Sequence, residues 1–132
     1  MVGGIIPLAT KNRNGGISYM KMKEKVENVL GSFQERNKDY AIEVYIRNGL
    51  TCNFMTRLLI PINRNVQLEE KKFLMDWKVG DAECNELSLP YDEIMDCYEE
   101  NCEEDGLKIT EKVVVILKNG MKFEFECCGV RV

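Results

Sequence analysis

The chain of 132 residues contains no histidine. Histidine is the side chain most often used as a general base, and it belongs to the familiar nucleophilic triads, so those mechanisms are excluded. The sequence also lacks a glycine-rich phosphate loop and a dinucleotide-binding fingerprint. We therefore expect a protein that is not an enzyme and that uses no cofactor.

Signals for a metal site and for a membrane span are also missing. The cysteines form no C-x-x-C motif, so a Cys or His metal site is not expected. No stretch approaches the ~20 apolar residues of a membrane span, and MVGGIIPLA at the N-terminus lacks the basic residues of a signal peptide. We expect a cytoplasmic protein whose thiols are reduced, namely Cys52, Cys84, Cys97, Cys102, Cys127 and Cys128.

Residues 1–19 differ in composition from the rest of the chain. They hold four of the ten glycines, a proline and no acidic residue. Gly15-Gly16 can be encoded by a good bacterial ribosome-binding sequence that lies at a suitable distance from a start codon at Met20 or Met22. We therefore interpret residues 1–19 as a flexible or non-native segment, and residues 20–132 as a single domain.

The stretch from Met20 to Lys38 has the pattern of an amphipathic helix. Its apolar residues fall at helical spacing on one stripe, while Lys and Glu fill the other positions: Val26, Val29, Leu30 and Phe33. Asn37 is a plausible stop. The narrow stripe predicts packing on a sheet or on a partner helix, which would make this helix the contact face of a homo-oligomer.

Two similar stretches, VYIRNGLTCNF at 44–54 and VILKNGMKFEF at 115–125, each predict a hairpin. Asn-Gly between alternating apolar residues is a strong hairpin signal, and a three-residue loop keeps one face apolar. In the first hairpin, this register pairs Ile46 with Leu50, Val44 with Cys52 and Ile42 with Phe54. In the second, it pairs Leu117 with Met121, Val115 with Phe123 and Val113 with Phe125. Both loops, 47–49 and 118–120, would place glycine in the left-handed region.

The rest of the chain predicts further strands. We expect the strand after the first hairpin to end before Pro61, a turn at 63–65, and a strand at 67–78 for which helix is the alternative. A turn at 80–81, a strand at 83–89, a short strand or helical segment at 91–98, a loop at 101–106 and a strand at 108–117 follow. The predicted class is α+β, with one N-terminal helix on a twisted antiparallel meander of six or seven strands; a half-open barrel is the alternative.

The strongest compositional signal is the acidic window from Val79 to Leu107, which contains no lysine or arginine. Eleven of the 22 acidic residues lie in it, so the rest of the chain carries +7 against a total of −4. These acids are Asp81, Glu83, Glu86, Asp92, Glu93, Asp96, Glu99, Glu100, Glu103, Glu104 and Asp105. Gathered on one surface, they would attract a basic partner. The alternative is a solvated face that only keeps the protein soluble.

The acidic window leads to our first functional hypothesis. Proteins that handle nucleic acids carry basic surfaces, and a compact acidic protein could occupy such a cleft in place of phosphates. We therefore expect a non-enzymatic inhibitor or adaptor with a basic protein partner. Its composition is similar to that of small phage and mobile-element proteins that block host defence.

Two other functions stay open. A curved sheet under a helix could enclose a small ligand in a pocket lined by Tyr45, Trp77 and Tyr91, with Arg57 or Asn85 as polar contacts. VILKNGMKFEFE, residues 115–126, resembles the strand–turn–strand of Sm-like RNA-binding barrels, and this resemblance implies RNA binding. Direct nucleic-acid binding is the weaker hypothesis, because it calls for a basic face with exposed aromatic residues.

Overall fold

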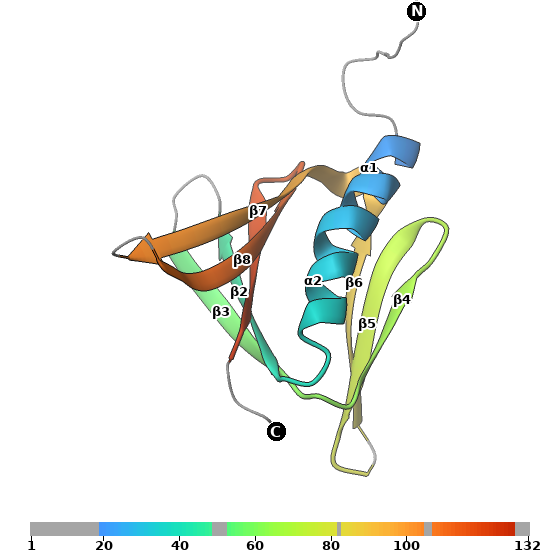
Figure 1. Cartoon of the computed structure of the whole chain (residues 1–132). Helices are drawn as coiled ribbons and strands as arrows, with labels where there is room; N and C mark the ends of the chain where they lie inside the picture. The colour runs from blue at the N-terminus through green and yellow to red at the C-terminus, as the bar shows by residue number, and fades with distance from the viewer. Residues whose placement is uncertain (1–18, 49–52, 82, 105–106, 129–132) are drawn as a thin grey trace, which may run out of the picture.

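The computed structural model describes residues 19–48, 53–81, 83–104 and 107–128. Over these residues the chain forms one helical segment followed by eight strands (Figure 1). The elements are α1 (Tyr19–Val26), η1 (Glu27–Gly31), α2 (Ser32–Arg36), β2 (Ile42–Asn48), β3 (Asn53–Ile60), β4 (Arg64–Leu68), β5 (Lys72–Val79), β6 (Glu83–Pro90), η2 (Tyr91–Glu93), β7 (Ile94–Glu104), β8 (Leu107–Leu117) and β9 (Met121–Cys127). The N-terminal segment 1–18 lies outside this description.

The predicted helix is confirmed. It runs from α1 through a π-helical turn, η1, into α2, and it ends at Asn37 as expected. The Asn37 backbone N–H and side-chain amide both donate to the Phe33 carbonyl, at 3.1 and 2.8 Å, and so satisfy an acceptor that the helix end would leave open. Val26, Leu30 and Phe33 are fully buried inside the protein. The apolar stripe therefore packs into the chain's own core.

The strands form two antiparallel sheets, and the helix lies between them (Figure 1). The five-stranded sheet has the order β3-β2-β9-β8-β7, and the three-stranded sheet has the order β4-β5-β6. The α+β class is confirmed, but the expected single meander is wrong: β2 pairs with β9, and no barrel closes over the described residues. The chain leaves one sheet for the other beside Pro61 and again beside Pro90, where proline cannot supply a ladder N–H.

The second hairpin forms in the predicted register. Val113 lies opposite Phe125, and Val115 lies opposite Phe123. Gly120 has a φ of 93°, and its N–H donates to the Leu117 carbonyl at 3.0 Å, which closes the loop at 118–120. A left-handed glycine after a short turn is the geometry that the Asn-Gly pattern predicts.

The first hairpin has a different register from the predicted one. Ile42 lies opposite Ile60 and not Phe54, and Val44 lies opposite Leu58 and not Cys52. Over Ile42–Ile46 the pairing differs from the prediction by six positions, an even number, so the same positions of β3 stay on the inner face. Alternation of period two cannot distinguish registers that differ by an even number. A bulge between Ile46 and Arg47 then shifts the register by one, which places Phe54 opposite Arg47, and the predicted loop at 47–49 is wrong because Arg47 and Asn48 belong to β2. Gly49, Leu50 and Cys52, on which the rest of this prediction depends, lie outside the described residues.

Three boundaries in the middle of the chain also differ from expectation. The stretch at 67–78 is extended as predicted, but a turn divides it between β4 and β5, with the Glu69 N–H donating to the Lys72 carbonyl at 2.9 Å. The bend that was expected at 63–65 lies one step earlier, because Arg64 already begins β4. The loop expected at 101–106 is wrong, since β7 continues to Glu104.

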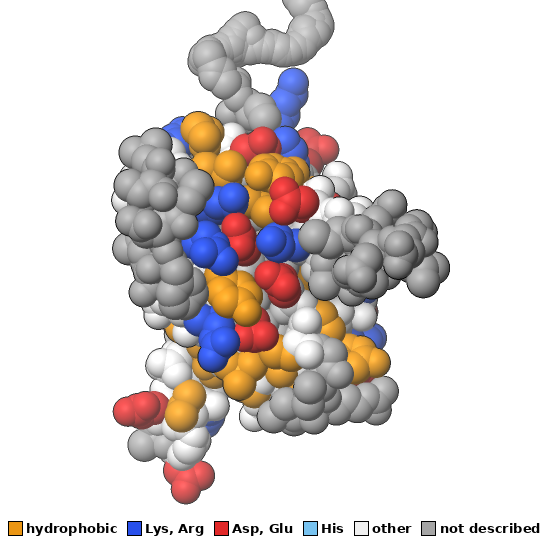
Figure 2. Space-filling view, turned by 90° about the vertical axis from the view of Figure 1, so that its left-hand side faces the viewer, with side chains coloured by type: hydrophobic (Ala, Val, Ile, Leu, Met, Phe, Trp, Pro, Cys, Tyr) orange, Lys and Arg blue, Asp and Glu red, His pale blue; other side chains and the backbone are white. Residues whose placement is uncertain are grey.

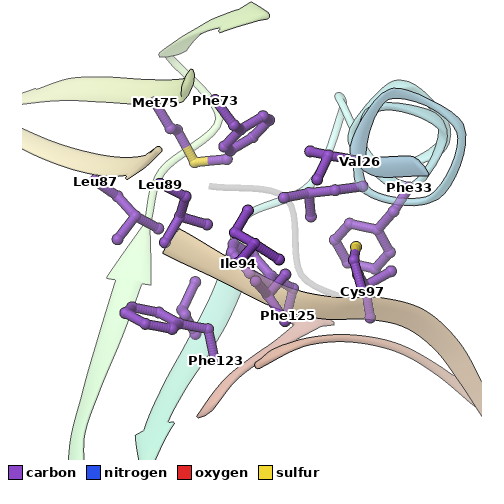
Figure 3. Close-up of a cluster of buried hydrophobic side chains, with 14 of the residues drawn as sticks. Val26, Phe33, Phe73, Met75, Leu87, Leu89, Ile94, Cys97, Phe123 and Phe125 are labelled. Atoms are coloured by element: carbon purple, nitrogen blue, oxygen red, sulfur yellow. The ribbon is translucent and has the colours of Figure 1, made fainter. Parts of the chain in front are cut away.

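One hydrophobic core joins the helix to both sheets (Figure 3). Phe33 enters it from the helix, Phe73 and Met75 from the three-stranded sheet, and Phe125 from the five-stranded sheet, all with no exposed surface. Because each sheet buries one face against the same helix, neither sheet has a core of its own. No helix among the described residues is both long enough and apolar enough to cross a membrane.

Candidate binding groove

The middle of the acidic window holds the helix in place. Lys25 on α1 contacts Asp96 on β7 at 2.6 Å, and Arg36 on α2 contacts Glu99 on β7 at 2.9 Å and Glu111 on β8 at 2.8 Å. The hydrogen bond from Lys25 lowers the pKa of the Asp96 carboxyl. These acids balance cations of the same chain. They are therefore not available as a free negative surface.

The other acids of the window do not share one surface. Asp92 and Glu93 are exposed in η2, at one end of β6, whereas Asp81, Glu83 and Glu86 are exposed at the other end. From Glu86 to the end of β6 at Pro90 the extended chain covers four positions, about 13 Å at ~3.3 Å per residue, and η2 lies beyond that end. Glu100 lies 3.8 Å from the Lys112 ammonium. Strand β7 ends with Glu103 and Glu104, and Asp105 lies outside the described residues. The single negative patch expected from the sequence is therefore absent from the described part of the chain.

The outer face of the five-stranded sheet carries charges of both signs. Figure 2 shows Lys and Arg side chains interleaved with Asp and Glu on this side of the molecule. At its centre Glu124 is buried and contacts Arg47 at 3.1 Å, Lys122 at 3.3 Å and Lys112 at 3.8 Å. Burial raises the pKa of this carboxyl, but the Arg47 hydrogen bond and the nearby lysines outweigh it and lower the pKa overall. This face therefore lacks the excess of positive charge that phosphate recognition favours.

The end of the β5–β6 hairpin projects beyond the rest of its sheet. β4 pairs with β5 only as far as Trp77, opposite Arg64, so residues 77–85 continue as a two-stranded hairpin that we call the arm (Figure 1). Trp77 and Val79 alternate with Lys78 along β5, and Asn85 lies opposite Trp77. The arm thus carries the inward-facing pattern of the sheet past the point where the core ends.

A hollow of about 270 Å³ lies between the arm and strand β3, and we call it the arm groove. Its lining residues come from three strands: Arg57, Leu58 and Leu59 of β3, Trp77 and Val79 of β5, and Asn85 and Glu86 of β6. Trp77 is 6% exposed, whereas Leu59 is 60% and Val79 is 50% exposed. The arm groove therefore has an aromatic side chain at its base and two exposed aliphatic side chains around it.

The polar groups of the arm groove are few. The Arg57 guanidinium lies 3.5 Å from Glu43 on the neighbouring strand, so its charge is already balanced. Glu86 is exposed and contacts no cation among the described residues, as is also true of Asp81 and Glu83 farther along the arm. The result is an apolar hollow with a net negative border.

Three of the five residues predicted to hold a ligand meet in the arm groove: Arg57, Trp77 and Asn85. The other two do not, because Tyr91 is buried in the core and Tyr45 lies near the Arg47 guanidinium, 5.6 Å from it, on the outer face of β2. Leu59 and Val79, which also line the arm groove, were not among the predicted residues. Two signals could have found them: adjacent leucines in one strand must point to opposite faces, and the apolar alternation of β5 runs past Trp77 to the turn.

The described thiols show no sign of activation. Cys97 is fully buried, and burial raises its pKa to about 12. Burial, together with the nearby Glu43 carboxylate, raises the pKa of Cys128. Since the thiolate is the reactive form, these shifts oppose nucleophilic chemistry at both sites.

Comparisons of the chain with protein-family models, with curated proteins and with solved structures found no match.

Proposed function

We propose that the protein is a non-enzymatic binding protein, an inhibitor or adaptor that engages a basic protein partner through the arm and the arm groove. The observation that carries the proposal is the combination of exposed acids on the β5–β6 hairpin with exposed aliphatic side chains on that hairpin and on the adjacent strand β3. Asp81, Glu83 and Glu86 supply the charge, and Leu59 and Val79 supply the apolar surface.

The two parts of this surface contribute differently to binding. Opposite charges around an interface mainly raise the association rate and select the partner, whereas buried apolar contacts slow dissociation. Acids that already pair with Lys25 and Arg36 can do neither without breaking contacts inside the protein. The proposed site is therefore narrower than the acidic window and includes only its first three acids. The partner class that we propose is a nucleic-acid-handling protein, which this chain would inhibit as an anti-defence protein of the phage or mobile-element type.

A pair of matched charge reversals tests the proposal. D81K/E83K changes two exposed acids on the arm, and D92K/E93K changes two exposed acids in η2, none of which contacts a described cation. The immobilised wild-type protein and both variants are incubated with host lysate at low and high salt, and the retained proteins are identified by mass spectrometry.

We expect the wild-type protein and D92K/E93K to retain the same basic protein at low salt and to release it at high salt, because salt screens exposed charges. The D81K/E83K variant should no longer retain this basic protein at low salt. Equal retention by both variants, or retention that does not depend on salt, would contradict the proposal. Purified partner and a titration would then give the affinities.

A small ligand is the second candidate for the same hollow. It is favoured by the meeting of Arg57, Trp77 and Asn85 in the arm groove. The volume of about 270 Å³ lies just below the range of roughly 300–1,000 Å³ for drug-sized ligands, so a ligand of that size would remain partly exposed. A metabolite that raises the melting temperature independently of salt would favour this function.

A further inference from the structure

The arm groove borders one face of the β5–β6 hairpin and also two strands that end their sheets. Its lining includes three consecutive residues of β3, Arg57, Leu58 and Leu59, and two consecutive residues of β6, Asn85 and Glu86. Consecutive residues of a strand point to opposite faces. Contact with consecutive residues is expected where a hollow lies beside the edge of a strand.

Both of these strands are edge strands. β3 is the last strand of the five-stranded sheet, and β6 is the last strand of the three-stranded sheet. An edge strand presents backbone N–H and C=O groups that can pair with an added strand. The arm groove therefore places backbone donors and acceptors beside an aromatic base and two exposed aliphatic side chains.

Resting on the proposed function, we infer that the arm groove binds an extended segment of the partner by strand addition, and that this segment alternates apolar residues with Lys or Arg. Apolar side chains on one face of the added strand would contact Trp77, Leu59 and Val79. Basic side chains would meet Glu86 and the acids farther along the arm. In strand addition, backbone hydrogen bonds supply affinity and alternate side chains supply specificity.

Charge also selects between a partner segment and a second copy of this chain. Two copies joined through β6 would bring Glu83 and Glu86 of one copy close to the same acids of the other. Like charges that face each other across paired strands destabilise the pairing. The same acids favour a basic strand, so a heterologous basic segment is the better occupant.

Synthetic peptides test this inference directly. Four nine-residue peptides alternate Lys with Val, Ile, Leu or Phe, and each has a matched version with N-methyl groups on alternate backbone nitrogens. N-methylation removes the hydrogen-bond donors of one strand edge but keeps the charge and the side chains. Trp77 is the only tryptophan of the chain, so its fluorescence reports binding at the arm groove.

We expect at least one unmodified peptide to bind, its N-methylated version to bind at least tenfold more weakly, and amide exchange to slow at residues 57–59 and 83–86. E86K should weaken binding, whereas E93K, a reversal of an exposed acid in η2, should not. Peptides of the same design with Glu in place of Lys should fail to bind.

The outcomes separate the two proposals. Equal binding of methylated and unmodified peptides would overturn strand addition and leave the charge-based function standing. If none of the four peptides binds but a lysate protein is still retained by the wild-type protein and not by D81K/E83K, only strand addition is overturned. Peptide-induced dimerisation or a dimer that excludes the peptide would assign the edge to a second copy. If arm reversals change neither peptide binding nor partner retention, both proposals fail.

Discussion

Arg64 provides the sharpest test of how this fold is held together. It is the first residue of β4 and donates four hydrogen bonds, from Nε to Gln34 Oε1 at 2.9 Å, from Nη1 to the carbonyls of Tyr40 and Pro61 at 2.8 and 2.9 Å, and from Nη2 to the Asn37 carbonyl at 2.9 Å. One guanidinium thus joins the end of the helix to the bend between the sheets. Burial lowers its pKa, but the group remains charged at neutral pH.

The cost of Arg64→Lys follows from this geometry. A lysine ammonium presents donors from a single nitrogen and cannot reach acceptors that are spread around a planar fork. We expect at least two of the four bonds to be lost, at about 1 kcal/mol each, which gives a destabilisation of about 2 kcal/mol. Arg64→Ala should cost about 3 kcal/mol because no donor remains for the half-buried carbonyls.

Urea unfolding followed by Trp77 fluorescence measures this effect. With an m-value of about 2 kcal/mol/M, Arg64→Lys should lower the midpoint by about 1 M without changing m. Arg57→Lys is the control, because Arg57 is exposed and its ion pair among the described residues is a single one, to Glu43 at 3.5 Å; its effect should stay below about 0.5 kcal/mol. If the free energy of unfolding of Arg64→Lys is also within about 0.5 kcal/mol of the wild-type value, the four hydrogen bonds do not hold the sheets and the helix together.

Three further predictions concern stability and thiol chemistry. Gly31→Ala should raise the free energy of unfolding by about 0.5–1 kcal/mol in the urea assay, because the added Cβ would lie 3.4 Å from Leu68 Cδ1, an ordinary contact. Glu124→Gln should cost about 1–2 kcal/mol at pH 7. Since the folded pKa of Glu124 is lowered from 4.5, its contribution is present above pH 4.5 and is lost as the pH falls through the folded pKa, so a pH series should show the variant and wild-type stabilities converging in acid. Ellman's reagent should modify the exposed Cys84 in the native protein but reach Cys97 only on unfolding, as peptide mass spectrometry would show.

A matched comparison serves as the control for each of these three predictions. Gly80→Ala should destabilise the protein, because Gly80 has a φ of +70°. If both glycine variants change the free energy of unfolding in the same direction, helix propensity does not explain the effect at Gly31. Glu126→Gln, at a half-buried glutamate of the same strand that forms no ion pair with a described residue, should cost less stability at pH 7 than Glu124→Gln. An equal response at both glutamates would contradict the role given to the cations around Glu124. Native-state labelling of Cys97 at the rate of Cys84 would contradict its burial.

The helix and the second hairpin were predictable because their signals are local. Helical spacing located the stripe that contains Leu30 and Phe33, and Asn119-Gly120 set a loop that admits one register. The first hairpin carried an equally clear Asn-Gly signal and still formed another register. Over Ile42–Ile46 the shift is even and preserves the inward positions, so the contacts of Ile60 and Leu58 with the rest of the core, together with the bulge after Ile46, decide between the registers.

The candidate site was predictable only in part. Trp77 and Asn85 could be proposed as neighbours in a pocket, but nothing local places Arg57 and Leu59 beside them, about 20 residues away along the chain. The acidic window shows the same limit. Its composition was plain, yet the pairing of Asp96 with Lys25 spans 71 positions and depends on where the helix packs.

The sequence by itself therefore determined the α+β class, the helix and its end, the alternation of apolar and polar residues in the strands, and the position of every charge along the chain. These depend on residues that are close along the chain, where spacing alone sets which side chains share a face. Only the tertiary structure decided the division into two sheets and the register of the first hairpin. It also decided which acids of the window pair with Lys25 and Arg36, and it brought the edge strands β3 and β6 together at the arm groove. Each of those depends on contacts between distant segments, whose geometry follows from packing the helix against both sheets at once.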